Sequence, residues 1–101
     1  MLKNFRTYQL AVAFYKQTAC LKLPPELRSQ LARAASSVAL NLAEGYGRNT
    51  KLDQKRFFSI ALGSIRECQA ILEISINIDE QITQSADSLA AHIYKLIKNY
   101  A

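Results

Sequence analysis

The stretch from Arg28 to Arg48 constrains the fold most strongly, because its apolar, small and polar residues each recur with helical spacing. The apolar stripe that runs through it consists of Leu27, Leu31, Ala35, Val38 and Leu42. Steps of three and four place such side chains on one face of an α-helix, and an apolar face has to be buried. We therefore predict a helix whose leucine-rich face belongs to a hydrophobic core.

Two further stripes lie on the same predicted helix. The small side chains are Ala32, Ser36, Ala39 and Ala43. The polar side chains are Arg33, Ser37, Asn41 and Glu44, and Leu40 interrupts them. Small residues let a second helix come close, and a fully solvated face has no need of Leu40. The pattern fits a helix with two neighbouring surfaces, one of them in another subunit, and equally a bundle helix with a polar outer side.

Periodic apolar residues and two prolines define the first half of the chain. We expect a first helix at Asn4–Leu21, with Asn4 as its N-cap and an aromatic-rich core face. Pro24 and Pro25 end this helix, and Pro25 suits the first turn of a second helix at Pro25–Tyr46. A connection this short predicts an antiparallel helical hairpin.

Turn residues and a capping pattern organise the second half. Gly45 and Gly47 are interpreted as the flexible end of the second helix. Thr50 begins a capping box, so a third and longest helix is expected at Leu52–Asn77, and a fourth at Asp79–Tyr100. With half of its residues hydrophobic and only three glycines, the chain predicts an all-α, up-and-down antiparallel four-helix bundle in one domain, 1–101.

The charge balance restricts the partners. Thirteen Lys and Arg against eight Asp and Glu give a formal charge of +5, which favours nucleic acid, an anionic membrane surface or an acidic protein. No apolar run approaches the ~20 residues of a membrane span and no signal-peptide pattern is present, so we expect a cytoplasmic protein without a membrane partner. Cys20 and Cys68 are expected to be reduced core residues, with no disulfide, metal or cofactor.

A longer motif resembles the bacterial 23S rRNA-intervening-sequence protein family. It reads Leu31-x-Arg33-Ala34-x-Ser36-x-x-x-x-Asn41-x-Ala43-Glu44-Gly45-x-Gly47-Arg48, followed by Phe57-x-x-x-Ala61-x-Gly63-Ser64-x-x-Glu67. The likeness extends upstream through Tyr15 and Pro24, and Leu62 departs from it where the family often has a basic residue. The resemblance implies a four-helix bundle that assembles as a ring-shaped homopentamer. It also implies a relationship to accessory proteins of diversity-generating retroelements, which bind nucleic acid and a reverse transcriptase.

Candidate functional residues follow from the charge pattern and from the motif. The expected nucleic-acid contacts are Arg48, Lys51, Lys55 and Arg56, with Lys3, Arg6, Lys95 and Lys98 as candidates to extend them. The alternative is a solvated charged surface. Phosphate contacts to RNA or DNA without base readout are expected, and the rival function is a scaffold for a protein such as a reverse transcriptase.

Other residues are assigned structural roles. A partly buried polar network is predicted for Arg33, Asn41, Glu44 and Glu67. Close helix packing or subunit contact is predicted for Ala32, Ser36, Ala39, Ala43 and Gly63. The only histidine, His92, is interpreted as a core-edge residue without a nucleophile beside it, so no catalytic residues and no enzymatic activity are expected.

Overall fold

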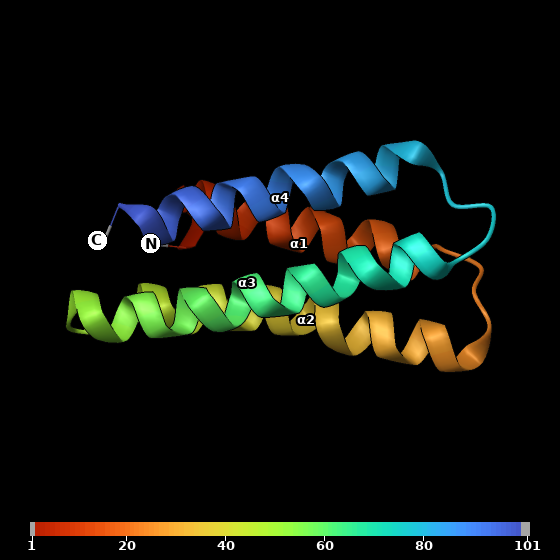
Figure 1. Ribbon diagram of the computed structural model, residues 1–101. Coiled ribbons are helices and arrows are strands. Elements are labelled where there is room, and N and C mark those ends of the chain that lie inside the picture. Colours follow the sequence, from red (N-terminus) through yellow and green to blue (C-terminus); the bar gives the residue numbers. More distant parts are fainter. Residues whose placement is uncertain (1, 100–101) are drawn as a thin grey trace.

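The computed structural model describes residues 2–99 and contains four α-helices in an up-and-down arrangement (Figure 1). A short 3-10 helix, η1 (Leu2–Asn4), precedes the helices α1 (Arg6–Ala19), α2 (Pro25–Tyr46), α3 (Lys51–Ile74) and α4 (Glu80–Lys98). No strand occurs within residues 2–99. The predicted all-α antiparallel four-helix bundle is therefore confirmed.

All four helices contribute to one hydrophobic core. The largest fully buried side chains are Phe14, Leu31, Val38, Leu42, Phe58, Ile65, Cys68, Leu89 and Ile93. The predicted leucine-rich face of α2 is buried from Leu31 to Leu42, whereas Leu27 at its start is only partly buried. Burial of this apolar surface is the main stabilising contribution, at about 25 cal/mol for each Å² removed from water.

Local chemistry explains where the helices begin. α2 begins at Pro25, whose missing N–H is not needed in a first turn. The Thr50 hydroxyl accepts a hydrogen bond from the Asp53 main-chain N–H at 3.1 Å, as the predicted capping box requires. The Asp79 carboxylate accepts from the Gln81 N–H at 2.9 Å and caps α4 in the same way.

The helix bounds within residues 2–99 differ from the predicted ones by at most three residues, within the expected margin of about 2–4 residues. Asn4 is not the N-cap of α1; it ends η1, and Phe5 occupies the cap position without a side-chain hydrogen bond. α1 ends at Ala19 rather than Leu21. α3 ends at Ile74, because Ser75 is extended (φ −83°, ψ 153°) and Asn77 adopts a positive φ of 61°. The predicted end of the fourth helix, Tyr100, lies outside the described residues.

Gly47 is the C-cap of α2, at the predicted end of the helix, but neither Gly45 nor Gly47 uses the freedom in φ that was expected of it. None of the three glycines, all within the described range, has a positive φ. Gly45 lies inside α2 and is buried, and a Cβ added to it would lie 2.7 Å from Cε1 of Phe58. Gly45 is therefore required for the close approach of α2 to α3 and not for a turn.

None of the helices within residues 2–99 is both long enough and apolar enough to cross a bilayer.

Candidate nucleic-acid interface

Charge is distributed unevenly along the bundle. The antiparallel topology brings η1, the start of α1, the α2–α3 turn and the end of α4 to one end of the molecule (Figure 1), which we call the basic end. Its basic residues are Lys3, Arg6, Arg48, Lys51, Lys55, Arg56, Lys95 and Lys98. Only two acids, Glu44 and Asp53, accompany them, so this end carries a formal charge of +6 and the rest of the chain −1.

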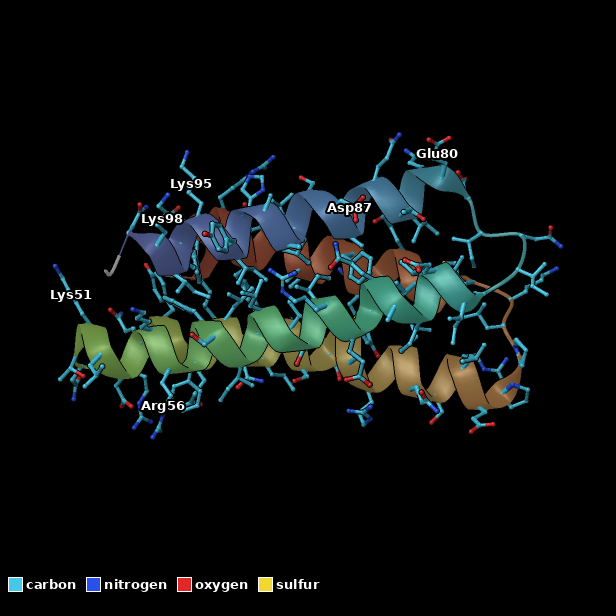
Figure 2. The ribbon with its side chains drawn as sticks, in the orientation of Figure 1. Lys51, Arg56, Glu80, Asp87, Lys95 and Lys98 are labelled. Atoms are coloured by element: carbon cyan, nitrogen blue, oxygen red, sulfur yellow. The ribbon has the colours of Figure 1, made fainter. Side chains whose placement is uncertain are left out.

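The side chains show the same polarity. Figure 2 places Lys51, Lys95 and Lys98 toward one end of the bundle and Glu80 at the other. The acids outside the basic end are Glu26, Glu67, Glu73, Asp79, Glu80 and Asp87. The four residues predicted as nucleic-acid contacts thus lie at the basic end, together with the four candidates proposed to extend them.

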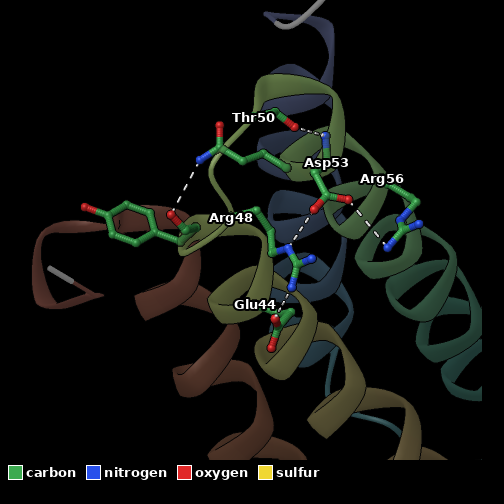
Figure 3. A network of polar contacts seen from close by, with 7 residues as sticks. Glu44, Arg48, Thr50, Asp53 and Arg56 are labelled. Carbon is green, nitrogen blue, oxygen red and sulfur yellow. Dashed lines mark hydrogen bonds and ion pairs between the residues drawn. The ribbon is translucent and has the colours of Figure 1, made fainter.

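The two arginines of the predicted cluster are engaged within the protein (Figure 3). Arg48 donates through Nε to Asp53 at 2.7 Å and through a terminal nitrogen to Glu44 at 3.1 Å. The bond to Asp53, and then the bond to Glu44, raises the pKa of Arg48 above its ordinary value. Arg56 lies 3.5 Å from the other oxygen of Asp53. One carboxylate therefore bridges both guanidinium groups across the α2–α3 corner.

An aromatic ring completes this corner. The guanidinium carbons of Arg48 and Arg56 lie 5.1 and 5.2 Å from the centroid of the Phe57 ring, within the range of cation–π attraction. By contrast, neither Lys51 nor Lys55 forms an ion pair with any residue of the range 2–99. The two lysines thus present charge that no carboxylate of the described chain neutralises.

The residues predicted to form one buried polar network are separated into three contacts. Arg33 and Glu67 form an ion pair at 2.5 Å, but their side chains are 65% and 40% exposed. The Asn41 side-chain amide donates to the Ser37 carbonyl at 2.8 Å, and Glu44 pairs with Arg48. The predicted contact between Arg33 and Glu67 is confirmed, and Glu67 and Asn41 are partly buried, but Arg33 and Glu44 are exposed and the four residues form separate contacts instead of one network.

The small residues fall into two environments. Ala39 packs against the core, and Ser36 and Ala43 are partly buried. Ala32 and Gly63 are exposed, and a Cβ added to Gly63 would meet nothing within 4 Å. A close approach of α2 to α3 falls at Gly45, which is not one of the small residues predicted for this role. Glycine in the middle of a helix lowers the stability of the fold by about 1 kcal/mol relative to alanine. No contact within residues 2–99 explains why glycine occupies position 63.

Two exposed apolar side chains, Leu40 and Ile60, lie within about one helical turn of the level of Gly63 on the α2–α3 pair. Ser37 and Ser64 contact each other through their hydroxyl oxygens at 2.9 Å, and this register places Leu40 of α2 level with Ile60 of α3. Leu40 is 68% exposed and Ile60 is 46% exposed. We call Leu40, Ile60 and Gly63 the outer face.

The remaining candidates for chemistry are isolated. His92 is exposed and its Nδ1 lies 2.8 Å from the Ser88 carbonyl, so it is not at the edge of the core. Cys20 is exposed, contrary to prediction, whereas Cys68 is buried and desolvation raises its pKa to about 12. Among residues 2–99, no group of three or more His, Cys, Asp or Glu is placed to hold a metal ion.

Comparisons with known proteins place the chain in a family. No curated protein sequence matches it. The sequence model described as "23S rRNA-intervening sequence protein" matches residues 3–99, nearly the whole chain. Together with the four-helix bundle, this match shows that the chain belongs to the 23S rRNA-intervening sequence protein family.

Proposed function

We propose that the protein is a homo-oligomer without enzymatic activity that binds nucleic acid through phosphate contacts at the basic end, without sequence preference. The observation that carries this proposal is the segregation of charge, +6 at one end of the bundle and −1 over the rest. A surface of one sign attracts a polyanion and orients it, whereas the same net charge spread evenly gives little direction. No base-reading motif accompanies the charge, so sequence preference is not expected.

The lysines carry most of the proposed binding. Arg48 and Arg56 are balanced in formal charge by Glu44 and Asp53, which contact them directly. The remaining positive charge at the basic end belongs to Lys3, Arg6, Lys51, Lys55, Lys95 and Lys98. In this proposal Arg48 and Arg56 mainly stabilise the α2–α3 corner. The lysines of that corner and of the end of α4 contact the phosphates.

Oligomerisation is the second part of the proposal. The outer face exposes Leu40 and Ile60 beside Gly63, whose missing side chain allows a neighbouring helix to approach closely. A second copy of the chain is the occupant we propose, in the ring of five copies that the family resemblance implies. Repetition of one basic end around a symmetry axis multiplies weak phosphate contacts into useful affinity.

Charge reversal at the basic end tests the binding. Lys51→Glu/Lys55→Glu removes two cations that have no ion-pair partner in the described part of the chain. The matched control Lys22→Glu/Arg28→Glu makes the same change in net charge outside the basic end. For a single strand, log K falls with log salt by about 0.7 for each phosphate contact. One contact therefore makes binding at about 0.1 M salt roughly fivefold tighter than binding at about 1 M salt. Fluorescence anisotropy with labelled RNA should therefore show a loss of about 25-fold or more for the first variant and a much smaller loss for the control.

The contrary outcomes distinguish two failures. Equal losses in both variants would mean that net charge alone matters and that the basic end is not the site. Absence of RNA and DNA binding by the unaltered protein at low salt would favour the alternative function, a scaffold whose basic end meets an acidic surface of a protein such as a reverse transcriptase.

A further inference from the structure

An open apolar recess lies at the basic end. It has a volume of about 490 Å³ and is lined by Leu2, Lys3, Ala43, Tyr46 and Gly47. Ligand sites in proteins typically fall in the range of about 300–1,000 Å³ and combine apolar walls with a few polar groups. Here the walls come from η1 and the end of α2, and among the described lining residues Lys3 is the charged one.

The spacing of three residues on α2 creates this recess. Ala43, Tyr46 and Gly47 are separated by three and four positions, so they share one face of the helix. Ala43 and Gly47 have little or no side chain, which leaves space beside the larger Tyr46. A substituent at Gly47 would point into open space, since the nearest atoms to an added Cβ are the carbonyl oxygens of Glu44 and Ala43 at 3.8 and 3.9 Å.

An aromatic series that reaches the core holds the Tyr46 ring in place. The ring stacks on Phe5, with centroids 4.9 Å apart and an interplanar angle of 23°. Phe5 in turn packs against Phe58, a core residue, at 6.0 Å. Tyr46 nevertheless remains 39% exposed. A ring that is both supported and accessible loses little conformational freedom when a planar ligand stacks on it.

Lys3 is held at the rim of the recess. The Gln9 side-chain amide donates to the Lys3 carbonyl oxygen and so ties η1 to α1. The neighbouring polar recess, beyond Gly47, is lined by Arg48 together with Glu44 and Asp53, so the charge of Arg48 is more than offset by the two carboxylates that contact it. An anionic group next to the apolar recess is therefore attracted to Lys3 and not to Arg48.

We infer that the apolar recess receives one unpaired base of a single-stranded nucleic acid, stacked on Tyr46, with an adjoining phosphate near Lys3. The inference rests on the proposed function, which supplies the polyanion, and adds which form of nucleic acid is preferred. A positively charged surface with an accessible aromatic ring is the arrangement by which proteins hold single strands, because every base has a stacking face. In a duplex those faces are covered by neighbouring base pairs.

A single-tryptophan reporter tests the inference. The chain contains no tryptophan, so Tyr46→Trp places the only indole in the recess. The matched control is Tyr15→Trp on α1, where the tyrosine is 38% exposed and lies outside the basic end. Single-stranded RNA should quench the indole at position 46 and leave the indole at position 15 unchanged. A duplex of equal length should bind with little quenching of either.

Two further variants measure the contribution to affinity. Tyr46→Leu removes the stacking ring and should weaken single-strand binding by about 5- to 150-fold, whereas Tyr46→Phe keeps the ring and should bind nearly as the unaltered protein does. Gly47→Leu fills the recess without a clash in the fold and should weaken single-strand binding while leaving duplex binding unchanged. Circular dichroism confirms that each variant is folded.

The outcomes separate this inference from the proposed function. Salt-dependent RNA binding without quenching at position 46, or equal quenching by single strand and duplex, would overturn the recess as a base site and leave the proposed function standing. Dissociation of an oligomer by Gly47→Leu would overturn it too, because the recess would then hold a second copy of the chain. If neither nucleic acid binds the unaltered protein, both proposals fail.

Discussion

Replacing Gly45 by alanine should destabilise the fold, because the new methyl group has no room. Its Cβ would lie 2.7 and 2.9 Å from Cε1 and Cδ1 of Phe58, and 3.1 Å from Cβ of Phe57. Phe58 is a core side chain at 1% exposure and also packs against Phe5, so its ring has no free space to enter. Either α2 and α3 separate at this level or the core around Phe58 repacks.

The size of the effect follows from two opposing contributions. Overfilling a packed core costs about 1–3 kcal/mol. Alanine recovers up to about 1 kcal/mol through its higher helix propensity, since Gly45 lies inside α2. A contact of 2.7 Å to a buried ring places the cost of overfilling in the upper part of its range, about 2–3 kcal/mol. The net loss should therefore be about 1–2 kcal/mol, which for a domain of about 100 residues lowers Tm by roughly 4–16 °C.

Thermal unfolding followed by circular dichroism, at one fixed protein concentration, measures this loss. Gly47→Ala is the matched control two residues later, because its Cβ would have no neighbour closer than 3.8 Å and its φ of −88° suits any L-residue. We expect its Tm to change little. The double variant Gly45→Ala/Phe58→Leu should lose less stability than the sum of the two single variants, since the smaller side chain makes space. A Tm for Gly45→Ala equal to or above that of Gly47→Ala would refute the reasoning.

Three other predictions address the outer face, the ion pair and the thiols. Leu40→Arg should shift the protein to smaller species in light scattering, because a charge replaces an exposed leucine of the proposed subunit contact; an unaltered protein that is already monomeric would contradict this. Arg33→Ala and Glu67→Ala should each change the free energy of unfolding by no more than about 1 kcal/mol in urea titrations, since the pair is exposed; a much larger loss would show that assembly buries it. At about pH 8 a thiol reagent should modify the exposed Cys20 quickly. Cys68 should react only on unfolding, because its burial raises its pKa to about 12. Two thiols that react equally fast would contradict the buried position of Cys68.

Patterns within single segments were sufficient to predict the helices. The stripe from Leu31 to Leu42 identified the core face of α2, Pro25 its first residue, and Thr50 with Asp53 the beginning of α3. Each of these signals acts over a few neighbouring residues. Local sequence therefore determines where these helices begin and which face of α2 is buried.

Properties that depend on two helices could not be predicted in this way. Gly45 appeared to be a cap, and only the position of Phe58 on α3 shows that it is a packing site. The Arg33–Glu67 pair was predicted correctly as a contact, but of its two side chains, both predicted to be partly buried, only Glu67 is partly buried, because exposure depends on how far each helix is rotated.

The same limit applies to the candidate interface. The cluster around the α2–α3 turn was visible as a run of basic residues, but its neutralisation by Asp53 requires the corner to be folded. The apolar recess was missed, although the spacing of Ala43, Tyr46 and Gly47 was a signal that could have suggested it. Its other wall comes from η1, which the sequence pattern did not predict.

The measurement that tests the central claim most directly is the salt dependence of single-stranded RNA binding by the unaltered protein, between about 50 and 200 mM salt. The account predicts a linear fall of log K with log salt. Each phosphate contact contributes a slope of about −0.7. The slope per subunit should therefore be about −1.4 if only Lys51 and Lys55 bind, and about −4 if all six basic side chains of this end that have no carboxylate partner within residues 2–99 bind. A slope near zero, or no binding at the lowest salt, would contradict phosphate recognition by the basic end.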